Sequence, residues 1–369
     1  MRKIIPSLST ALVRRLIIST ILFTSLLLNS IYCLAAAPSQ SPAKITFLTW
    51  GDYINPELVT QFEAEYNAKV NFVYFESDDD RDELLINTDA LGYDMLMVDS
   101  VNLLSYKKLG WISAFNTQSA PNINFAQLPE LSSLNKRDQI CAPYSWGTTG
   151  IAYRKDLVAE PITSWKQVFT PAPELQGKIL MSNMSKEVVG MALKSLGYSM
   201  TSSDSQELEQ ARQLLLAQAP SVAGYSPVAS DTKKAKLVTG QASVTLTYSG
   251  DALMLQALEP QVEYVLPKEG GGVWADFICL SAKASSVELA HQFINYINRP
   301  QQAADNAQYI YCATPNSEAE KLLPSEFLNN SIIYPDKALV AQSETYTLLS
   351  PRTIKKHNTI MRELRNAIK

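Results

Sequence analysis

The chain has 369 residues, of which 46% are hydrophobic and 18% are charged, with a formal net charge of -4. That balance is typical of a globular protein long enough for two domains, and it excludes a disordered or fibrous chain. An acidic chain also gives no electrostatic basis for binding nucleic acid, so no nucleic-acid partner is expected.

Residues 1–37 predict a secretory signal peptide. Basic residues without any acid precede an apolar run over residues 16–28, and Ala35–Ala37 supply the small residues of a cleavage region. Because Pro38 follows, we expect cleavage one or two residues before the end of this alanine run. An uncleaved anchor is the alternative, since the apolar stretch extended to Leu34 nears the length that spans a bilayer.

Strand and helix patterns alternate in the first part of the exported chain. The predicted strands are Lys44–Trp50, Val70–Phe75 and Tyr93–Val98, and helices are predicted from Asn55–Pro56, over Asp79–Asn87 and over Val101–Leu109. This order predicts a mostly parallel sheet with right-handed crossovers. Ligands of such sheets lie beyond the carboxyl ends of the strands, where Trp50, Asp52 and Ser100 fall.

A second α/β unit is predicted from about residue 140. Its predicted strands are Ile140–Ser145, Lys178–Met181, Ala242–Tyr248, Val262–Leu266 and Val273–Leu280, and its helices are Lys186–Leu196, Ser205–Ala217 and Ile354–Ile368. Gly147–Gly150 are expected to form a flexible connection. The pattern Ser285–Glu288 predicts a capping box at the start of a helix that runs to Asn298.

Three cysteines remain after the leader, Cys141, Cys279 and Cys312, and they are far apart in the sequence. This spacing excludes a disulfide-rich scaffold and a zinc ribbon. The three could form one disulfide, but we expect none.

Aromatic and carboxylate residues occur close together at three predicted strand ends. The groups are Trp50-Gly51-Asp52-Tyr53, Tyr248-Ser249-Gly250-Asp251 and Trp274-Ala275-Asp276. A ring face attracts cations and covers methylene groups, and a carboxylate accepts hydrogen bonds from ammonium. The pairs therefore predict a ligand made of an alkyl chain with amines, although single rings and acids at such positions are more often core packing and solvated surface.

Longer motifs extend this interpretation to a family. The stretches Thr49–Ile54 with Pro56, Pro143–Ile151, and Pro267–Gly271 through Trp274-Ala275-Asp276 resemble the periplasmic spermidine/putrescine-binding proteins of bacterial ABC importers. Glu187-Val188-Val189, Ala313–Asn316 and Tyr334-Pro335-Asp336 follow in the family's order. The resemblance covers nearly the whole exported chain.

The resemblance implies an α/β periplasmic-binding-protein fold with two lobes, each a mostly parallel sheet flanked by helices, and a ligand cleft between them. We expect lobe 1 to comprise residues 38–147 and 275–319, and lobe 2 residues 148–274 and 320–369. The implied function is to bind putrescine or spermidine in the periplasm as a monomer and deliver it to an inner-membrane ABC permease. Neither catalysis, a cofactor nor a metal is expected.

Matching the motifs residue by residue implies which side chains bind the ligand. The implied binding residues are Trp50, Asp52, Tyr53, Ser100, Glu187, Tyr248, Asp251, Trp274 and Asp276. Met184 stands where the spermidine-preferring branch of the family has an aspartate. Asn102 replaces a serine or tyrosine of the family, and Cys312 stands where a tyrosine of the cleft is expected. Because the loss of an acid at Met184 removes one amine anchor, we expect putrescine, with spermidine close behind.

Two other classes of function stay open at this point. Asp251 and Asp276 could serve a secreted glycoside hydrolase, since their aromatic neighbours also suit sugar stacking. Tyr309 and Tyr311 could contribute to a ferric site. The familiar hydrolase, P-loop and dinucleotide motifs are all absent from the sequence.

Overall fold

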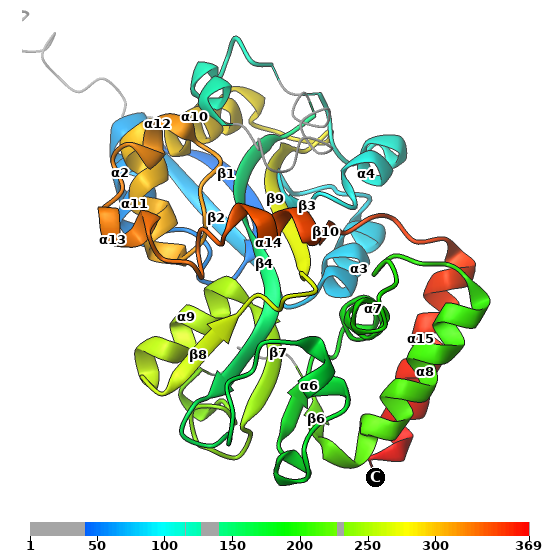
Figure 1. Cartoon of the computed structure of the whole chain (residues 1–369). Helices are drawn as coiled ribbons and strands as arrows, with labels where there is room; N and C mark the ends of the chain where they lie inside the picture. The colour runs from blue at the N-terminus through cyan, green and yellow to red at the C-terminus, as the bar shows by residue number, and fades with distance from the viewer. Residues whose placement is uncertain (1–40, 115, 127–139, 227–231, 369) are drawn as a thin grey trace, which may run out of the picture. The chain divides into compact units, whose positions relative to one another are not determined.

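The protein was analysed as a computed structural model, which describes residues 41–114, 116–126, 140–226 and 232–368 (Figure 1). The predicted signal peptide, residues 1–37, lies outside the described residues. Residues Ala43–Lys369 form one compact unit. Among its described helices, none combines the length and the apolar character needed to cross a bilayer.

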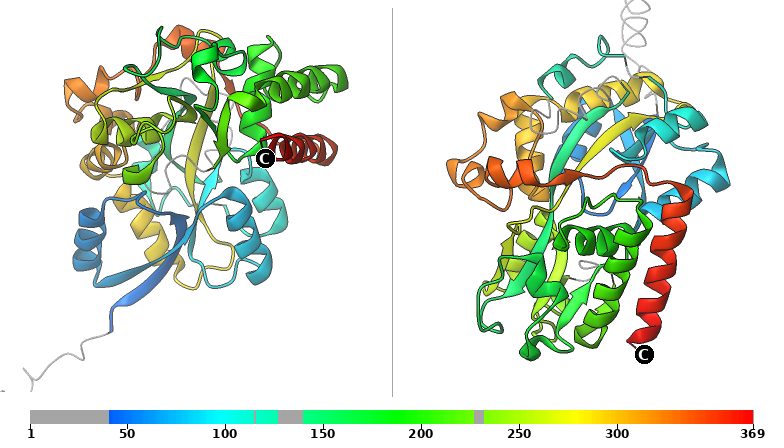
Figure 2. Two further views of the ribbon diagram at one scale, coloured as in Figure 1. Left: turned by 90° about the horizontal axis from the view of Figure 1, so that it is seen from below. Right: turned by 45° about the vertical axis from the view of Figure 1, so that its right-hand side comes forward.

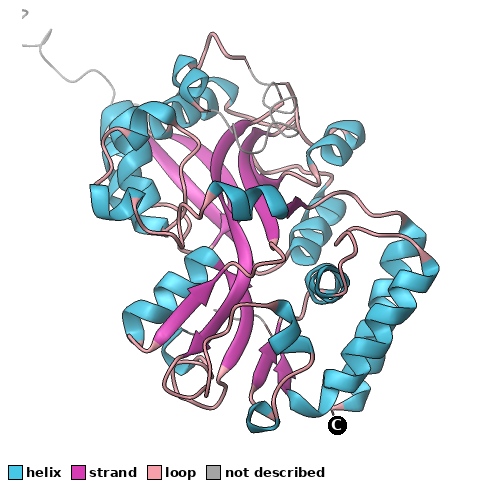
Figure 3. Ribbon diagram, in the orientation of Figure 1, coloured by secondary structure: helices cyan, strands magenta, loops and turns pink. Residues whose placement is uncertain are grey.

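In the described part of the chain, one mixed sheet of ten strands forms the centre of the unit; Figure 3 shows this sheet with helices around it. The main path is β2 (Ala68–Phe75), β1 (Ala43–Trp50), β3 (Met95–Asp99), β9 (Gly272–Leu280), β4 (Ala142–Arg154), β7 (Val244–Tyr248), β5 (Ile179–Met181) and β6 (Val222–Tyr225). β10 (Glu344–Thr345) pairs with β9, and β8 (Val262–Val265) pairs with β4. β1 is parallel to β2 and β3, and β5 is parallel to β6 and β7, while β9 and β4 join the two sets by antiparallel pairing.

The first parallel set belongs to lobe 1, where the predicted βαβαβα order is confirmed. The helices that alternate with these strands are α2 (Pro56–Tyr66), α3 (Asp78–Thr88) and α4 (Leu103–Leu109). Further along the chain are η1 (Pro121–Phe125), α10 (Val287–Ile297), α11 (Pro300–Ile310), α12 (Ser317–Glu320) and α13 (Ser325–Leu328). Asn55 caps α2 by accepting a hydrogen bond from the Glu57 amide, and Gly110 ends α4 in the left-handed conformation. Both boundaries follow from the sequence signals at these residues.

The buried hydrophobic side chains around β1, β2 and β3 are called the lobe 1 core, and those around β5, β6 and β7 the lobe 2 core. The remaining helices are α6 (Trp165–Phe169), η3 (Pro173–Leu175), α7 (Ser185–Ser195), α8 (Ser205–Gln218), η4 (Ala219–Ser221), η5 (Thr232–Lys234), α9 (Ser249–Leu258), α14 (Lys337–Gln342) and α15 (Pro351–Ala367). α15 lies against α7 and α8, as the views in Figure 2 show. Trp274 packs against both the lobe 1 core and the lobe 2 core, which places its ring where the two lobes meet.

The glycines after Trp146 do not form the flexible connection that we expected. β4 continues without a break to Arg154, and all of its residues are buried. Gly147 faces Trp274 across the pairing with β9, and Gly150 lies against Tyr264. Glycine is needed here because other chain segments approach the strand closely. The prediction that these glycines form a flexible connection was therefore wrong.

The start of α10 also differs from the prediction. Ser286 is the N-cap residue but makes no side-chain cap hydrogen bond, so the expected capping box does not form. Instead the Asp94 carboxylate accepts hydrogen bonds from the amides of Ser285 and Ser286, at 2.7 and 2.9 Å. A residue distant in the sequence therefore replaces the local cap.

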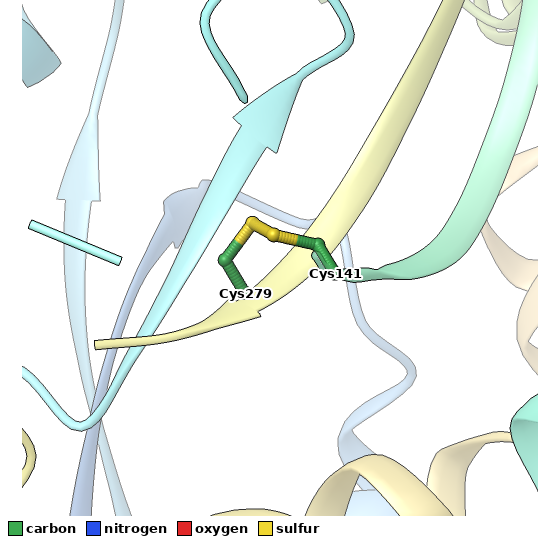
Figure 4. The surroundings of a disulfide bond; sticks show 2 residues. All are labelled: Cys141 and Cys279. Atoms are coloured by element: carbon green, nitrogen blue, oxygen red, sulfur yellow. A yellow bond between two sulfur atoms is a disulfide. The ribbon is translucent and has the colours of Figure 1, made fainter. Parts of the chain in front are cut away.

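The expectation of free cysteines was wrong for two of the three. Cys141 and Cys279 form a disulfide with a Cα–Cα distance of 4.5 Å, whereas Cys312 is free and buried (Figure 4). Ala142 pairs with Ile278, so the antiparallel register of β4 and β9 places the two cysteines opposite each other. Their separation of 138 residues in the sequence gave no local signal of this pairing.

Candidate functional site

Asp276 lies where three strands run side by side. It sits on β9 opposite Asp99 of β3 on one side and Ser145 of β4 on the other. The Tyr53 hydroxyl donates to Asp276 Oδ2 at 2.8 Å and lies 2.8 Å from Ser145 Oγ. Since the tyrosine proton goes to the carboxylate, the serine hydroxyl is the donor in the second hydrogen bond.

The Asp276 carboxyl is buried, with 8% of its residue surface exposed. Burial raises its pKa to about 7, and the hydrogen bond from Tyr53 offsets part of that rise. The negative charges of Asp99 and Asp78 raise the pKa of Asp276 further. The positive charge of Arg81 lowers the pKa of Asp276 only in part, and among the described residues the carboxyl group has no ion-pair partner.

A second carboxylate comes from the first turn of α7. Glu187 is buried and accepts a hydrogen bond from the Tyr248 hydroxyl at the end of β7. The rings of Tyr248 and Trp274 meet edge to face with their centroids 6.0 Å apart. Burial raises the pKa of Glu187 to about 7, partly offset by Lys186. Among the described residues, the buried indole N–H of Trp274 has no hydrogen-bond acceptor.

Asp251 supplies a third carboxylate from the first turn of α9. Burial raises its pKa to about 6, and its charge in turn raises the pKa of Glu187. Burial and the charges of Asp251 and Asp276 together raise the pKa of the Cys312 thiol. Cys312 is therefore within electrostatic reach of both carboxylates, which links the Asp251 side of the site to the Asp276 side.

The cations that act on these acids form ion pairs with other carboxylates. Arg81 is fully buried and contacts Asp99 at 2.8 Å and Asp78 at 3.3 Å. Lys186 contacts Asp78 at 2.6 Å. Over the described residues, no lysine or arginine forms an ion pair with the three acids that have raised pKa values, which are Glu187, Asp251 and Asp276.

The structure brings seven of the nine predicted binding residues into two adjoining groups. In the first, Tyr53 contacts Asp276, and the buried Ser100 donates its amide to the carbonyl of Ala275 at 2.9 Å. Glu187, Tyr248, Asp251 and Trp274 make up the other group.

Trp50 and Asp52 make no hydrogen bond or ring contact with those groups among the described residues. Trp50 ends β1 and packs on Phe75 with a centroid distance of 4.3 Å. Asp52 is exposed in a left-handed turn, and its charge acts on the hydroxyl of Tyr309, whose pKa is raised mainly by burial. No described contact joins these two residues to the carboxylates, so their role in binding stays a prediction.

Sequence reasoning missed several charged residues around the site. Asp78 belongs to an acidic run that reads as the start of a helix, and it does lie in the first turn of α3, after the N-cap Ser77. Arg81 and Lys186 resemble ordinary helix-surface residues in the sequence. For these charged residues, the sequence contained one signal of a place near the site: Asp99 directly follows a predicted strand.

The rival ferric site gains no support from the geometry of the described residues. In the part of the chain that the structure describes, no three His, Cys, Asp or Glu side chains are placed to share a metal ion. Tyr309 and Tyr311 are both 38% exposed at the end of α11.

The fold and the carboxylates at the meeting of two lobes are those of a protein that binds a small solute. The chain belongs to the family of bacterial extracellular solute-binding proteins, whose pattern matches residues 57–333. Membership places the protein outside the cytoplasm and confirms the resemblance found in the sequence.

Named relatives narrow the class further. The spermidine/putrescine-binding periplasmic protein of Salmonella typhimurium is 30% identical over 84% of this chain and 88% of its own. The substrate-binding protein PotD of a spermidine/putrescine ABC transporter from Streptococcus pneumoniae superposes with a TM-score of 0.78 and 27% identity, over 89% of this chain and all of its own. A putative spermidine/putrescine ABC transporter protein from Listeria monocytogenes gives a TM-score of 0.77 and 30% identity, over 87% and 98%. The Salmonella and Streptococcus proteins are named as binding proteins.

Proposed function

We propose that the protein binds a polyamine, putrescine or spermidine, in the periplasm and delivers it to an inner-membrane ABC permease. The observation that carries the proposal is the presence of three largely buried carboxyl groups, Glu187, Asp251 and Asp276, without a cationic partner among the described residues. Relatives with polyamine-binding names over most of the chain support the same ligand class. A chain of methylenes ending in ammonium groups supplies the missing charges.

The energies of these contacts are sufficient to hold such a ligand. Charge-assisted hydrogen bonds contribute about 1.5 to 3 kcal/mol each, and a desolvated cation over an aromatic ring adds about 0.5 to 2 kcal/mol. Trp274 and Tyr248 stand beside Glu187, so an ammonium bound there meets both kinds of partner. The ligand thereby gains most when both lobes contact it, which favours the closed form.

Putrescine is the preferred ligand in this proposal. Met184 lies beside the Glu187 end, where its sulfur is 3.5 Å from the Tyr248 hydroxyl. A thioether is only a weak hydrogen-bond acceptor for ammonium. This end of the site therefore binds an ammonium group less strongly than it would with a carboxylate in place of Met184. A diamine needs fewer anchors than a triamine.

We also propose that the protein acts as a monomer. The lobe boundaries at 147/148, 274/275 and 319/320 stay a proposal as well. In the hydrophobic packing, Ile333 and Val340 join the lobe 1 core, whereas Tyr346 and Ile360 join the lobe 2 core.

A panel of thermal-shift measurements tests the proposed function. Putrescine, spermidine and cadaverine should raise the melting temperature in proportion to the logarithm of their concentration, because a ligand of the folded state alone stabilises it. Sugars and neutral amino acids should leave it unchanged. An unchanged melting temperature with every polyamine would contradict the proposal.

The glycoside-hydrolase alternative finds no support in the comparisons. Incubation with polyamine or with aryl glycosides should give no product. Turnover of a glycoside that disappears in Asp276→Asn would restore that alternative.

A further inference from the structure

Lys186 places an ammonium group between the two lobes. It lies in the first turn of α7, whose neighbours Val188 and Val189 belong to the lobe 2 core. Its Nζ donates to Asp78 Oδ2 of α3 at 2.6 Å, and α3 packs into the lobe 1 core through Leu85. The side chains of Lys186 and Asp78 are 33% and 16% exposed, so the pair is only partly open to solvent.

The surroundings of this ammonium have the chemistry of an amine-binding site. Nζ lies 5.7 Å from the centroid of the Tyr346 ring, a residue that is itself buried. Burial lowers the pKa of Lys186, but the charges of Asp78 and Asp99 and the hydrogen bond to Asp78 raise it above its ordinary value. Glu187 adds a further negative charge nearby. One ring and several carboxylates thus surround a single ammonium.

The same carboxylates also act on the proposed polyamine site. Asp78 raises the pKa of Glu187 and of Asp276, so its charge is within electrostatic reach of both binding acids. Asp99 of β3 lies directly opposite Asp276 of β9 in the antiparallel register of the two strands. The carboxylates around Lys186 Nζ therefore act electrostatically on the acids of the proposed polyamine site.

A lysine side chain is four methylene groups ending in an ammonium, which is also the structure of the aminobutyl arm of putrescine and spermidine. We propose, on the basis of the proposed polyamine function, that Lys186 fills an amine subsite made by Asp78 and Tyr346 and so limits how many ammonium groups a ligand can place in the site. The protein supplies one aminobutyl arm itself. Lys186 is then a specificity-determining residue that excludes the additional amine of a longer polyamine.

Shortening this side chain should open the subsite. Lys186→Ala removes the ammonium and most of its volume. Asp78 Oδ2 then loses its lysine partner and can bind an ammonium of the ligand, while Oδ1 keeps its contact with Arg81. Calorimetric titration should then show the affinity for spermine rising at least about tenfold relative to putrescine, the scale of one charge-assisted hydrogen bond. Lys186→Ser leaves the same space and carries the test if the alanine variant does not fold.

Two controls separate an opened subsite from a general change in charge. Lys186→Met removes the charge but keeps a long side chain in place, so the spermine-to-putrescine ratio should rise far less. Lys186→Ala combined with Asp78→Asn removes the carboxylate of the subsite and should return the ratio to that of the wild type. Melting temperatures of all variants report whether the fold is retained.

The outcomes distinguish this inference from the function on which it rests. If Lys186→Ala weakens putrescine and spermine equally, the Lys186–Asp78 pair only ties the lobes together, and the inference is overturned while polyamine binding stands. An unchanged ratio overturns it as well. If the wild type binds no polyamine, the proposed function falls and takes the inference with it.

Discussion

Proton release should accompany ligand binding, because the site acids Asp276 and Glu187 each have a pKa of about 7 in the free protein. A bound ammonium favours the ionised carboxylate, so the ligand must displace whatever protons these groups hold. At pH 6 a group with a pKa of 7 is ionised in roughly one molecule in eleven, and at pH 8 in roughly ten of eleven. Each such carboxylate therefore makes binding about tenfold weaker at pH 6 than at pH 8, or about 1.4 kcal/mol.

Calorimetric titration of putrescine in buffers with different ionisation enthalpies measures the protons released. We expect release at pH 6 and almost none at pH 8, with the affinity increasing steadily between the two. Asp276→Asn removes one titrating group and should make the affinity less dependent on pH, besides weakening it throughout. Glu57→Gln alters an exposed carboxylate at the start of α2 and serves as the control that keeps the wild-type slope.

The same acids determine how the stability of the free protein depends on pH. A carboxyl group with a raised folded-state pKa keeps its proton where the unfolded chain has already lost it. The free energy of unfolding of the free protein should therefore fall as the pH rises from about 4 to about 7. An affinity that is flat between pH 6 and pH 8, with no proton release, would refute the assignment of Asp276 and Glu187 as ligand carboxylates.

Two further substitutions test how the site is supported. In Gly147→Ala, the new Cβ would clash with the Trp274 ring, displace it and weaken polyamine binding at least about tenfold. Gly51→Ala is the control, because a Cβ there has no atom within 4 Å, and this variant should bind polyamine normally. Equal affinities of the two variants would show that the position of Trp274 is unimportant for binding. Replacing Cys141 and Cys279 by serine should lower the free energy of unfolding by about 2 to 5 kcal/mol, measured by urea denaturation. An unaltered midpoint in that experiment would mean that the disulfide contributes nothing to stability.

The sequence predicted the elements of lobe 1 because their boundaries depend on local signals. Asn55 and Gly110 determine the ends of their helices through their own side chain or backbone conformation. The ring-carboxylate pairs were also visible, since each falls within a few residues. Alternation of strands and helices was enough to give the fold class.

Features that depend on contacts between distant residues could not be predicted in the same way. The disulfide requires the register of β4 against β9, and the start of α10 requires Asp94, which directly precedes β3. The length of β4 was not predicted because Gly147 and Gly150 are typical of a loop, and the sequence does not show that Trp274 and Tyr264 pack against them. Lys186 and Asp78 acquire their significance only when α7 and α3 come together.

A crystal structure of the protein with putrescine tests the central claim most directly. Our account predicts ammonium nitrogens within hydrogen-bonding distance of Asp276 and of Glu187, with the methylene chain against Trp274 and Lys186 still bound to Asp78. A ligand bound elsewhere, with both carboxyl groups facing only protein atoms, would contradict it.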